Sequence, residues 1–125
     1  MKVAIITDTH WGARNDSQAF TNYFIKFYEE IFFPYLDKHD IKHIIHMGDY
    51  FDRRKFINFA SMQRNIEHFV KPMQDRGITM DLIIGNHDTY YKNTNEVNSP
   101  ALLLYGQPNI TVYEEHVVKD YDELD

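Results

Sequence analysis

Three short polar motifs in this sequence contain the kinds of side chain that bind divalent cations. They are Asp8-Thr9-His10, the segment from Gly48 to Asp52, and Gly85-Asn86-His87-Asp88. Carboxylates, an amide oxygen and one imidazole form a mixed, rather hard ligand set, which favours Mn²⁺ or Mg²⁺ and is also compatible with zinc or iron. Each motif alone is common in proteins that hold no metal. The prediction of a metal site therefore depends on whether the fold brings the three motifs together.

The segments that precede these motifs predict β-strands. Residues 3–7, 41–47 and 79–84 are short, apolar and rich in β-branched side chains, and each ends where a polar motif begins. Helical patterns lie between them, so we expect parallel strands joined by right-handed crossovers, with helices on both faces of the sheet. The fold class is therefore α/β with layered elements. Two further strands are predicted at residues 110–113 and 116–118, after a polar loop over 85–98 and a short helix opening at Ser99-Pro100.

This architecture predicts where the polar motifs meet. Parallel strands end at one edge of their sheet, where ligands bind, so the three following loops converge there. In extended backbone, residues two apart project to the same side, so Asp8 and His10 are placed to hold one cation together. Asp49 and Asn86 would reach the same point from the neighbouring loops. Gly48 allows the sharp turn that this arrangement needs.

The two predicted helices differ in how clearly their buried face is marked. The helix over 58–76 has one apolar stripe, formed by Phe59, Met62, Ile66, Phe69 and Met73. Gly77 is placed to end it. The first helix is capped by Asp16 or Ser17 and ended or bent by Pro34. Its apolar side chains are more numerous: Phe20, Phe24, Phe27 and Ile31 form the stripe, which Tyr23, Tyr28 and Phe32 widen. We expect this helix to be wedged between the sheet and its neighbours, or to meet another chain or a missing segment.

Composition narrows the possible classes of protein. A length of 125 residues with 43% hydrophobic and 26% charged residues is typical of one globular domain. The absence of cysteine excludes disulfides, thiolate metal sites and cysteine nucleophiles. A net charge of −6 argues against a free-standing nucleic-acid clamp, so contact with DNA must be local or metal-assisted. Arg53, Arg54 and Lys55 are the candidates for DNA-phosphate contact, the alternative being a solvated basic turn. No apolar run suits a signal peptide or membrane span, so we expect a cytoplasmic protein with no membrane contact.

The motifs, in their order along the chain, resemble the calcineurin-like metallophosphoesterases. That family has the signature Asp-x-His, Gly-Asp-x-x-Asp and Gly-Asn-His followed by Asp or Glu. Within it the chain is most similar to the SbcD-type DNA repair nucleases, and particularly to tailed-phage recombination endonuclease subunits. This narrower resemblance depends on Trp11-Gly12, on Gly48 to Asp52 and on Tyr90-Tyr91-Lys92-Asn93. It implies a layered fold of mostly parallel sheets flanked by helices.

The resemblance also implies roles for individual residues. The metal ligands would be Asp8, His10, Asp49 and Asn86, with Asp49 bridging two ions of Mn²⁺, or of Mg²⁺. His87 would face the scissile phosphate and Asp88 would orient its imidazole. Asp52 would either form a hydrogen bond to one of the metal ligands without touching the metal itself or take a direct part in the site. The implied function is exonuclease or endonuclease cleavage of DNA in recombination and double-strand-break repair. The partners would be an SbcC-type ATPase and a second copy of the full-length protein, in the host cytoplasm if a phage encodes it.

One departure from the family pattern concerns the later histidines. The family completes its site with Gly-His and Gly-His-x-His segments, and no glycine in this sequence precedes a histidine. We therefore expect residues 1–125 to be the N-terminal part of a nuclease domain, inactive alone, with the rest of the catalytic domain and the DNA-capping region absent. Four other histidines, His39, His43, His46 and His68, are expected at strand edges or facing solvent rather than on a metal.

Two other functions stay open from the sequence. One is a protein phosphatase or nucleotide phosphohydrolase of the same superfamily, because Gly48 to Arg53 also resembles the Gly-Asp-x-Val-Asp-Arg of the serine/threonine phosphatases. Trp11 and Asp88 count against it. The other is a non-catalytic scaffold with the same fold, which the presence of all the motif residues disfavours.

Overall fold

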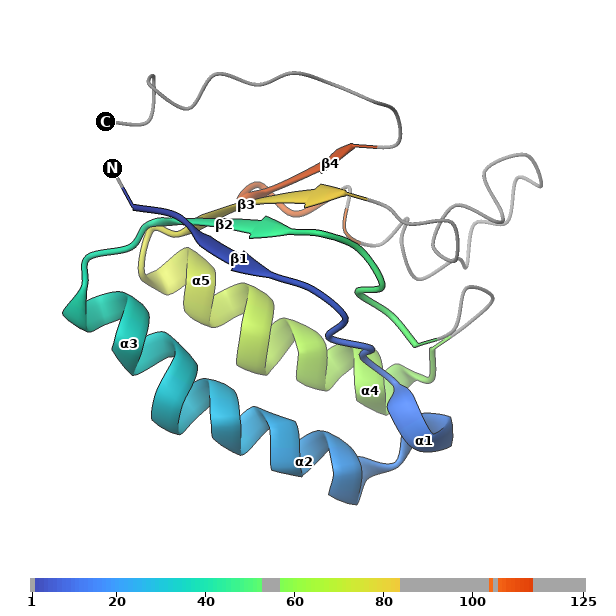
Figure 1. Cartoon of the computed structure of the whole chain (residues 1–125). Helices are drawn as coiled ribbons and strands as arrows, with labels where there is room; N and C mark the ends of the chain where they lie inside the picture. Colours follow the sequence, from blue (N-terminus) through green and yellow to red (C-terminus); the bar gives the residue numbers. More distant parts are fainter. Residues whose placement is uncertain (1, 53–56, 84–103, 105, 114–125) are drawn as a thin grey trace.

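The computed structural model of this chain contains one four-stranded parallel sheet (Figure 1). It describes residues 2–52, 57–83, 104 and 106–113. The strands β1 (Ala4–Ile6), β2 (His43–His46), β3 (Thr79–Ile83) and β4 (Ile110–Tyr113) lie side by side in the order of the sequence. Their register pairs Ile6 with His46 and His46 with Leu82. The predicted α/β class and the first three strands are confirmed, because short β-branched runs between helical segments have few other arrangements.

Two long helical segments connect the first three strands. The first consists of α2 (Gln18–Phe27), η1 (Tyr28–Phe32) and α3 (Phe33–Lys38), and the second of α4 (Phe59–Asn65), η2 (Ile66–Val70) and α5 (Lys71–Asp75). Each begins at a polar cap: Ser17 Oγ accepts from the Phe20 N–H at 3.3 Å, and Asn58 Oδ1 from the Ser61 N–H at 2.8 Å. No helix among the described residues is both long and apolar enough to cross a bilayer.

A wide π turn precedes the proline in each helical segment. Pro34 follows η1 and Pro72 follows η2, and both helices continue past the proline, to Lys38 and Asp75 respectively. Proline has no N–H to donate to the carbonyl four residues earlier, and its ring crowds that carbonyl. A locally wider turn gives the ring room, so Pro34 does not end the helix.

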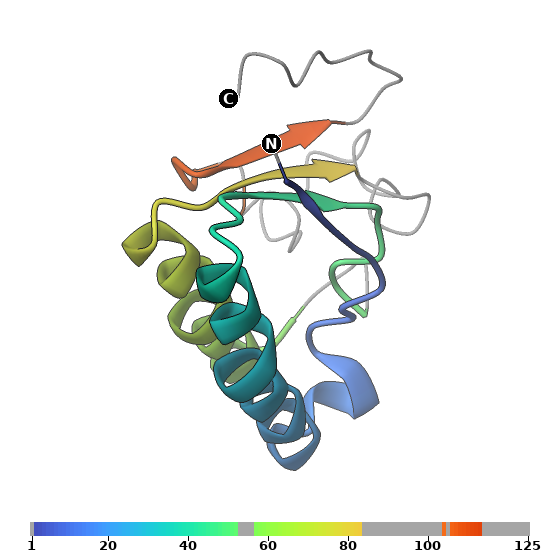
Figure 2. The ribbon, with the colours of Figure 1, turned by 60° about the vertical axis from the view of Figure 1, so that its left-hand side comes forward.

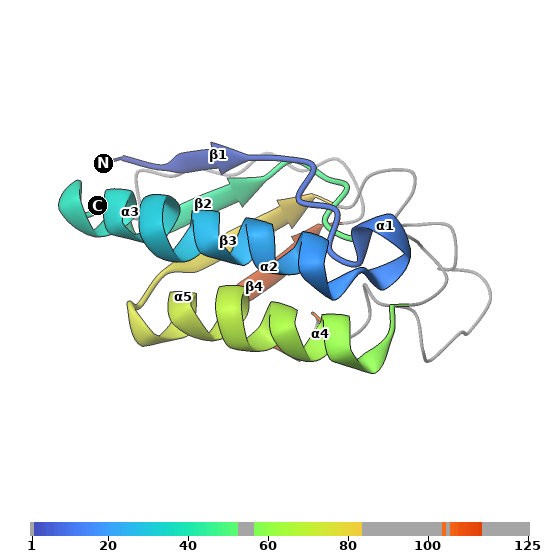
Figure 3. The ribbon, with the colours of Figure 1, turned by 90° about the horizontal axis from the view of Figure 1, so that it is seen from below.

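Both helical segments cover the same face of the sheet, as Figures 2 and 3 show from two directions. The prediction of helices on both faces is therefore wrong for the part of the chain that the structure describes. The reason is the strand order: successive right-handed crossovers that step in one direction along a sheet all pass on one side. Ile5 and Ile83, on the other face, are 66% and 40% exposed.

The first helical segment buries a different stripe from the one predicted. Its buried side chains are Thr21, Ile25, Tyr28, Phe33 and Leu36, whereas Phe24, Phe27 and Ile31 are 39%, 43% and 59% exposed. These exposed residues, with Tyr23, line a groove of about 650 Å³ together with Ile6 and the loop that follows β1. Apolar residues occupy two faces of this helix, so periodicity alone does not choose the buried one.

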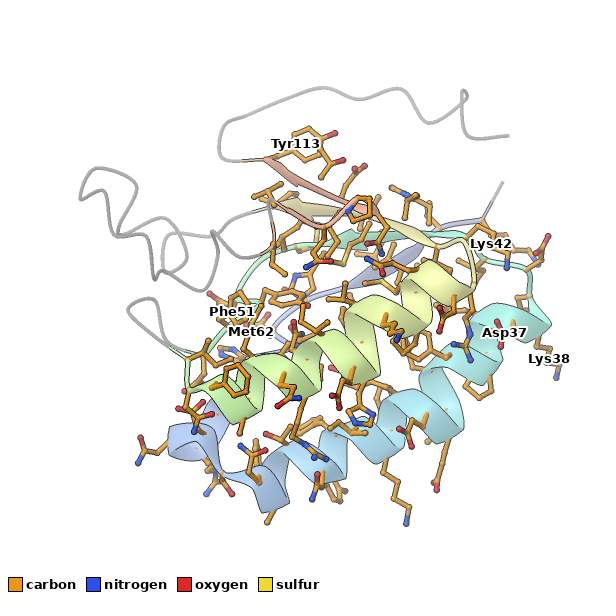
Figure 4. The ribbon with its side chains drawn as sticks, turned by 180° about the vertical axis from the view of Figure 1, so that it is seen from behind. Asp37, Lys38, Lys42, Phe51, Met62 and Tyr113 are labelled. Atoms are coloured by element: carbon orange, nitrogen blue, oxygen red, sulfur yellow. The ribbon has the colours of Figure 1, made fainter. Side chains whose placement is uncertain are left out.

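The core lies between the helices and the sheet and is rich in aromatic rings. Phe69 of η2 is fully buried, and its ring centre lies 5.1 Å from that of Tyr28 and 5.9 Å from those of Trp11 and Tyr50. Phe51 also belongs to this core, and Met62 packs against it. Figure 4 shows both of these residues at one end of the molecule, whereas Asp37, Lys38 and Lys42 lie at the other. The core thus extends beneath the loops that leave the carboxyl ends of the strands.

Candidate metal centre

Two loops run side by side at the carboxyl ends of β1 and β2. The N–H of Asp8 donates to the Gly48 carbonyl at 3.0 Å, that of His10 to the Asp49 carbonyl at 3.0 Å, and that of Trp11 to the Tyr50 carbonyl at 2.8 Å. The pairing therefore continues for several residues past the regular strands. Because backbone hydrogen bonds join the two motifs, their side chains are held close to one another.

Three potential ligands meet where these loops run together. One oxygen or nitrogen atom from each of Asp8, His10 and Asp49 lies within 4.8 Å of the others. Asp8 Oδ1 is 3.2 Å from His10 Nε2. On the other side of the imidazole, Asp52 Oδ1 lies 3.4 Å from His10 Nδ1, at an angle that makes it a close polar contact rather than a hydrogen bond. The ring is thus placed between two carboxylates.

The backbone at these residues is left-handed, not extended. The φ angles of Asp8, His10 and Asp49 are 57°, 46° and 53°, and Gly48 has φ of 121°. Non-glycine residues adopt this conformation rarely, and it persists only where surrounding contacts enforce it. The extended geometry predicted for Asp8 and His10 is therefore wrong, because β1 ends at Ile6. Their side chains come together through two left-handed residues instead.

The charge on the Asp8 carboxylate is stabilised by its neighbours. Hydrogen bonds from the Thr7 hydroxyl, at 2.7 Å, and from His10 lower the pKa of Asp8 below its ordinary value. Asp8 is therefore ionised at neutral pH, and a second carboxylate, that of Asp49, lies nearby. Two close carboxylates and an imidazole, partly open to solvent, suit a divalent cation. The residues present thus fit the metal that the sequence predicts.

Trp11 connects the two loops to the core. Its side chain is buried and stacks on Tyr28, with ring centres 5.7 Å apart and planes inclined by 17°. Its carbonyl accepts from the N–H of Asp52 at 2.9 Å. Gly12 follows with φ of 90°, and a β-carbon there would come 3.0 Å from Asp16 Oδ1. The Trp-Gly pair therefore anchors the first metal-binding loop.

Two histidines of β2 are buried, contrary to the prediction that they lie at strand edges or face solvent. His43 is 5% exposed and His46 is fully buried. His46 Nε2 lies 2.9 Å from Thr9 Oγ1, and its Nδ1 accepts from the Gly48 N–H at 3.1 Å. His46 is on the helix-facing side of β2, as Ile44 is, and this alternation was the signal in the sequence that indicated burial.

His46 makes folding stability sensitive to acid. Burial lowers the pKa of His46 to about 4, while the ordinary histidine value is about 6.5, so the unfolded chain takes up the proton first. Its contribution to stability is complete above pH 6.5 and is lost as the pH falls towards 4. We expect the free energy of unfolding to drop by about 2 kcal/mol between pH 7 and pH 4.5 from this group alone. Urea unfolding across this range should show a weaker pH dependence for His46→Gln, and equal dependence in both proteins would contradict the assignment.

The remaining predicted site residues lie outside the described part of the chain. They are Asn86, His87, Asp88, Arg53, Arg54 and Lys55. Of the predicted metal ligands, the structure therefore brings together Asp8, His10 and Asp49, and it places Asp52, which was predicted to contact a ligand, beside the His10 imidazole. Thr9 and His46 were not predicted as parts of the site.

The fold and this cluster of ligands place the chain among the metallophosphoesterases. Residues 1–123 match the calcineurin-like phosphoesterase family, and the chain belongs to that family. It is 34% identical over 122 residues to exonuclease subunit 1 of Enterobacteria phage T4, an alignment that covers 98% of this chain and 35% of the phage protein. The fold is similar to that in the crystal structure of Pseudomonas putida nuclease MPE, with a TM-score of 0.61 and 24% identity over 94% of this chain and 50% of the other. The chain thus spans half or less of the length of these relatives.

Proposed function

We propose that this chain contributes the first half of a two-metal site in a Mn²⁺-dependent nuclease that hydrolyses the phosphodiester bonds of DNA. The observation that carries the proposal is the cluster of Asp8, His10 and Asp49 at the carboxyl edge of the sheet, in a chain of the calcineurin-like phosphoesterase family. Nuclease chemistry is favoured over other phosphoesterase activities because the phage T4 relative is named as an exonuclease subunit.

The described side chains provide binding and orientation for this chemistry. Asp8 and Asp49 supply the negative charge that attracts a divalent cation, and His10 offers Nε2 on the same side as Asp8. Asp52 lies against the other ring nitrogen, Nδ1, so a cation that replaced the Asp8–His10 hydrogen bond at Nε2 would leave the ring proton on Nδ1, facing Asp52. Divalent cations bound in such a site lower the pKa of a coordinated water and neutralise charge on phosphoryl oxygens.

The second half of the site and the partners are also proposals. Asn86 would supply a further ligand, while His87, oriented by Asp88, would contact the scissile phosphate. Arg53, Arg54 and Lys55 would add local positive charge to a chain whose net charge is −6, and DNA binding requires such charge near the metal. We further propose an SbcC-type ATPase partner, a homodimer of the full-length protein and a role in DNA recombination and double-strand-break repair in the cytoplasm.

Because few neutral ligands offset the repulsion between Asp8 and Asp49, residues 1–125 alone should bind Mn²⁺ weakly and cleave poorly.

The test is substrate cleavage by the natural protein that contains this chain. The substrates are end-labelled linear duplex DNA, bis(p-nitrophenyl) phosphate as a diester and p-nitrophenyl phosphate as a monoester, each with Mn²⁺, Mg²⁺ or EDTA. We expect cleavage of DNA and the diester with Mn²⁺, little hydrolysis of the monoester and none in EDTA. Asp49→Asn, which keeps the shape of the side chain, is the matched inactive control.

The other outcomes identify the alternative functions. Hydrolysis of the monoester alone would indicate a phosphatase and would reject the nuclease proposal. Saturable Mn²⁺ binding without cleavage of any substrate, in the presence of the ATPase partner, would indicate a scaffold that has kept the metal site. Cleavage in EDTA at the same rate as with Mn²⁺ would reject a metal-dependent mechanism.

A further inference from the structure

A series of hydrogen bonds through Thr9 and His46 lies directly beneath the candidate metal centre and connects its two loops. Thr9, between Asp8 and His10, places its hydroxyl 2.9 Å from His46 Nε2 and donates to the Tyr50 carbonyl at 3.0 Å. His46 Nδ1 accepts from the Gly48 N–H at 3.1 Å. One side chain from each of β2 and the first loop therefore contacts backbone atoms on both sides of Asp49.

The geometry determines the direction of every bond in this chain. The Gly48 N–H can only donate, so His46 Nδ1 carries no proton, and a neutral imidazole then has its proton on Nε2. That proton is donated to Thr9 Oγ1, and the Thr9 hydroxyl proton goes to the Tyr50 carbonyl. Both ring nitrogens of His46 are thus occupied, so this histidine does not have a free nitrogen for a metal.

The chain of bonds matters because the residues beside it adopt costly conformations. Asp8 and His10, which flank Thr9, and Asp49, which follows Gly48, all have φ between 46° and 57°. Left-handed backbone is unfavourable for residues other than glycine and relaxes unless other contacts oppose it. Backbone hydrogen bonds join the two loops at Asp8, His10 and Trp11, and the Thr9–His46 bonds add side-chain contacts to the backbone on both sides of Asp49.

We propose that His46 and Thr9 are positioning residues that hold the two loops of the metal centre at the separation a divalent cation requires. This inference rests on the proposed metal-dependent function and deepens it, since it assigns residues outside the ligand set to metal affinity. Neither side chain touches the metal in this scheme. Removing an outer contact of this kind typically weakens metal binding by about 10–100-fold.

The same sheet offers a matched control at its opposite end. His43, at the amino end of β2, lies 2.7 Å from Thr79 Oγ1 through Nδ1 and 3.0 Å from Asp81 Oδ2 through Nε2, so it also forms a histidine–threonine hydrogen bond. This pair contacts neither metal-binding loop in the described structure. Thr79→Val therefore breaks the same kind of bond as Thr9→Val while leaving the metal centre untouched.

The experiment measures the Mn²⁺ affinity of the natural full-length protein by titrating the paramagnetic resonance signal of the free ion. We expect Thr9→Val to weaken binding about 10–100-fold, Thr9→Ser to recover most of the affinity, and Thr79→Val to bind within about twofold of the wild type. His46→Gln, which keeps a donor near the Nε2 position but no acceptor for Gly48, should lie in between. Circular dichroism of each variant checks that it is folded.

Amide hydrogen exchange without metal separates this inference from the proposed function. In Thr9→Val, exchange of the His10 and Gly48 amides should accelerate about tenfold or more while the amides of β2 and β3 keep their rates. Faster exchange with unchanged Mn²⁺ affinity would overturn the positioning role but leave the proposed metal site intact. A wild-type full-length protein with no saturable Mn²⁺ binding would overturn both. Nitrogen-15 correlation spectra should find the His46 proton on Nε2, and a proton on Nδ1 would contradict the bonding scheme.

Discussion

Replacing Asp49 by alanine is expected to weaken Mn²⁺ binding by about 100-fold or more, because the cluster loses one of its three described ligands. Asp8 and His10 remain, but both belong to one loop, and the other carboxylate of the second loop, Asp52, lies against His10 Nδ1 rather than in the ligand cluster. The measurement is the titration of free Mn²⁺ by paramagnetic resonance, with thermal unfolding of the metal-free protein recorded in parallel. Unfolding should change little, since the loss of carboxylate repulsion opposes the strain of alanine at φ of 53°.

Two control variants separate the possible causes of such a loss. Asp49→Asn removes the charge but keeps a side chain that tolerates left-handed backbone, so it tests charge without conformational change. Asp75→Ala removes the same charge from the exposed end of α5, at the opposite edge of the sheet, and should leave Mn²⁺ affinity unchanged. If Asp49→Ala and Asp75→Ala bind Mn²⁺ equally well, Asp49 is not a ligand.

In the natural full-length protein, His87→Ala should fail in a different way from Asp49→Ala. His87 lies outside the described residues, and the resemblance assigns it to the phosphate rather than to the metal. Its loss should cost roughly 10² to 10⁴ in the rate of DNA cleavage, as for a general acid, while Mn²⁺ and DNA binding persist. Loss of metal binding in His87→Ala as severe as in Asp49→Ala would show that this assignment is wrong.

Phe69→Ala is expected to lower the free energy of unfolding by about 3–5 kcal/mol, the usual cost of truncating a fully buried phenylalanine. The rings of Tyr28, Trp11 and Tyr50 all pack against Phe69, with ring centres no more than 5.9 Å from its own. None of these rings can move into the cavity left by alanine without losing its contacts to other core residues. The loss is a large part of the total stability of a domain of this size. Urea unfolding at pH 7 measures it.

Phe59→Ala provides the matched control for this substitution. Phe59 begins the same helical segment but is 81% exposed, so the change should stay within about 0.5 kcal/mol. Because Trp11 and Tyr50 also hold the metal-binding loops, Phe69→Ala should weaken Mn²⁺ binding at temperatures where it is still folded. Equal stability of the two variants would show that packing around Phe69 does not contribute to the stability of the aromatic core.

The sequence by itself determined the order and type of the main elements. Short β-branched runs lie at residues 3–7, 41–47 and 79–84, and the segments between them have helical periodicity, with Ser17 and Asn58 at the starts of the helices. Such a sequence has few arrangements other than parallel strands joined by helical crossovers. It also determined that the Asp8 and Asp49 motifs follow two successive strands of the chain. Their convergence follows from topology, because parallel strands end at the same edge.

Tertiary structure alone decided which side chains are buried. The helix from Ser17 has apolar residues on more than one face, and packing against Phe69 selects Tyr28 while leaving Phe27 and Ile31 exposed. Periodicity measures how apolar residues are distributed around a helix, but burial depends on where the neighbouring elements lie. The placement of both helices on one face likewise follows from the strand order, which no local pattern contains.

The details of the metal centre were also decided by tertiary contacts. Sequence motifs predict which residues are ligands, whereas the left-handed backbone of Asp8, His10 and Asp49 depends on hydrogen bonds to a loop some forty residues away. The same holds for His46, whose polar ring is tolerated in the core because Thr9 and Gly48 satisfy both nitrogens. A buried histidine is stable only with partners, and in this protein both partners belong to the loops that carry the ligands.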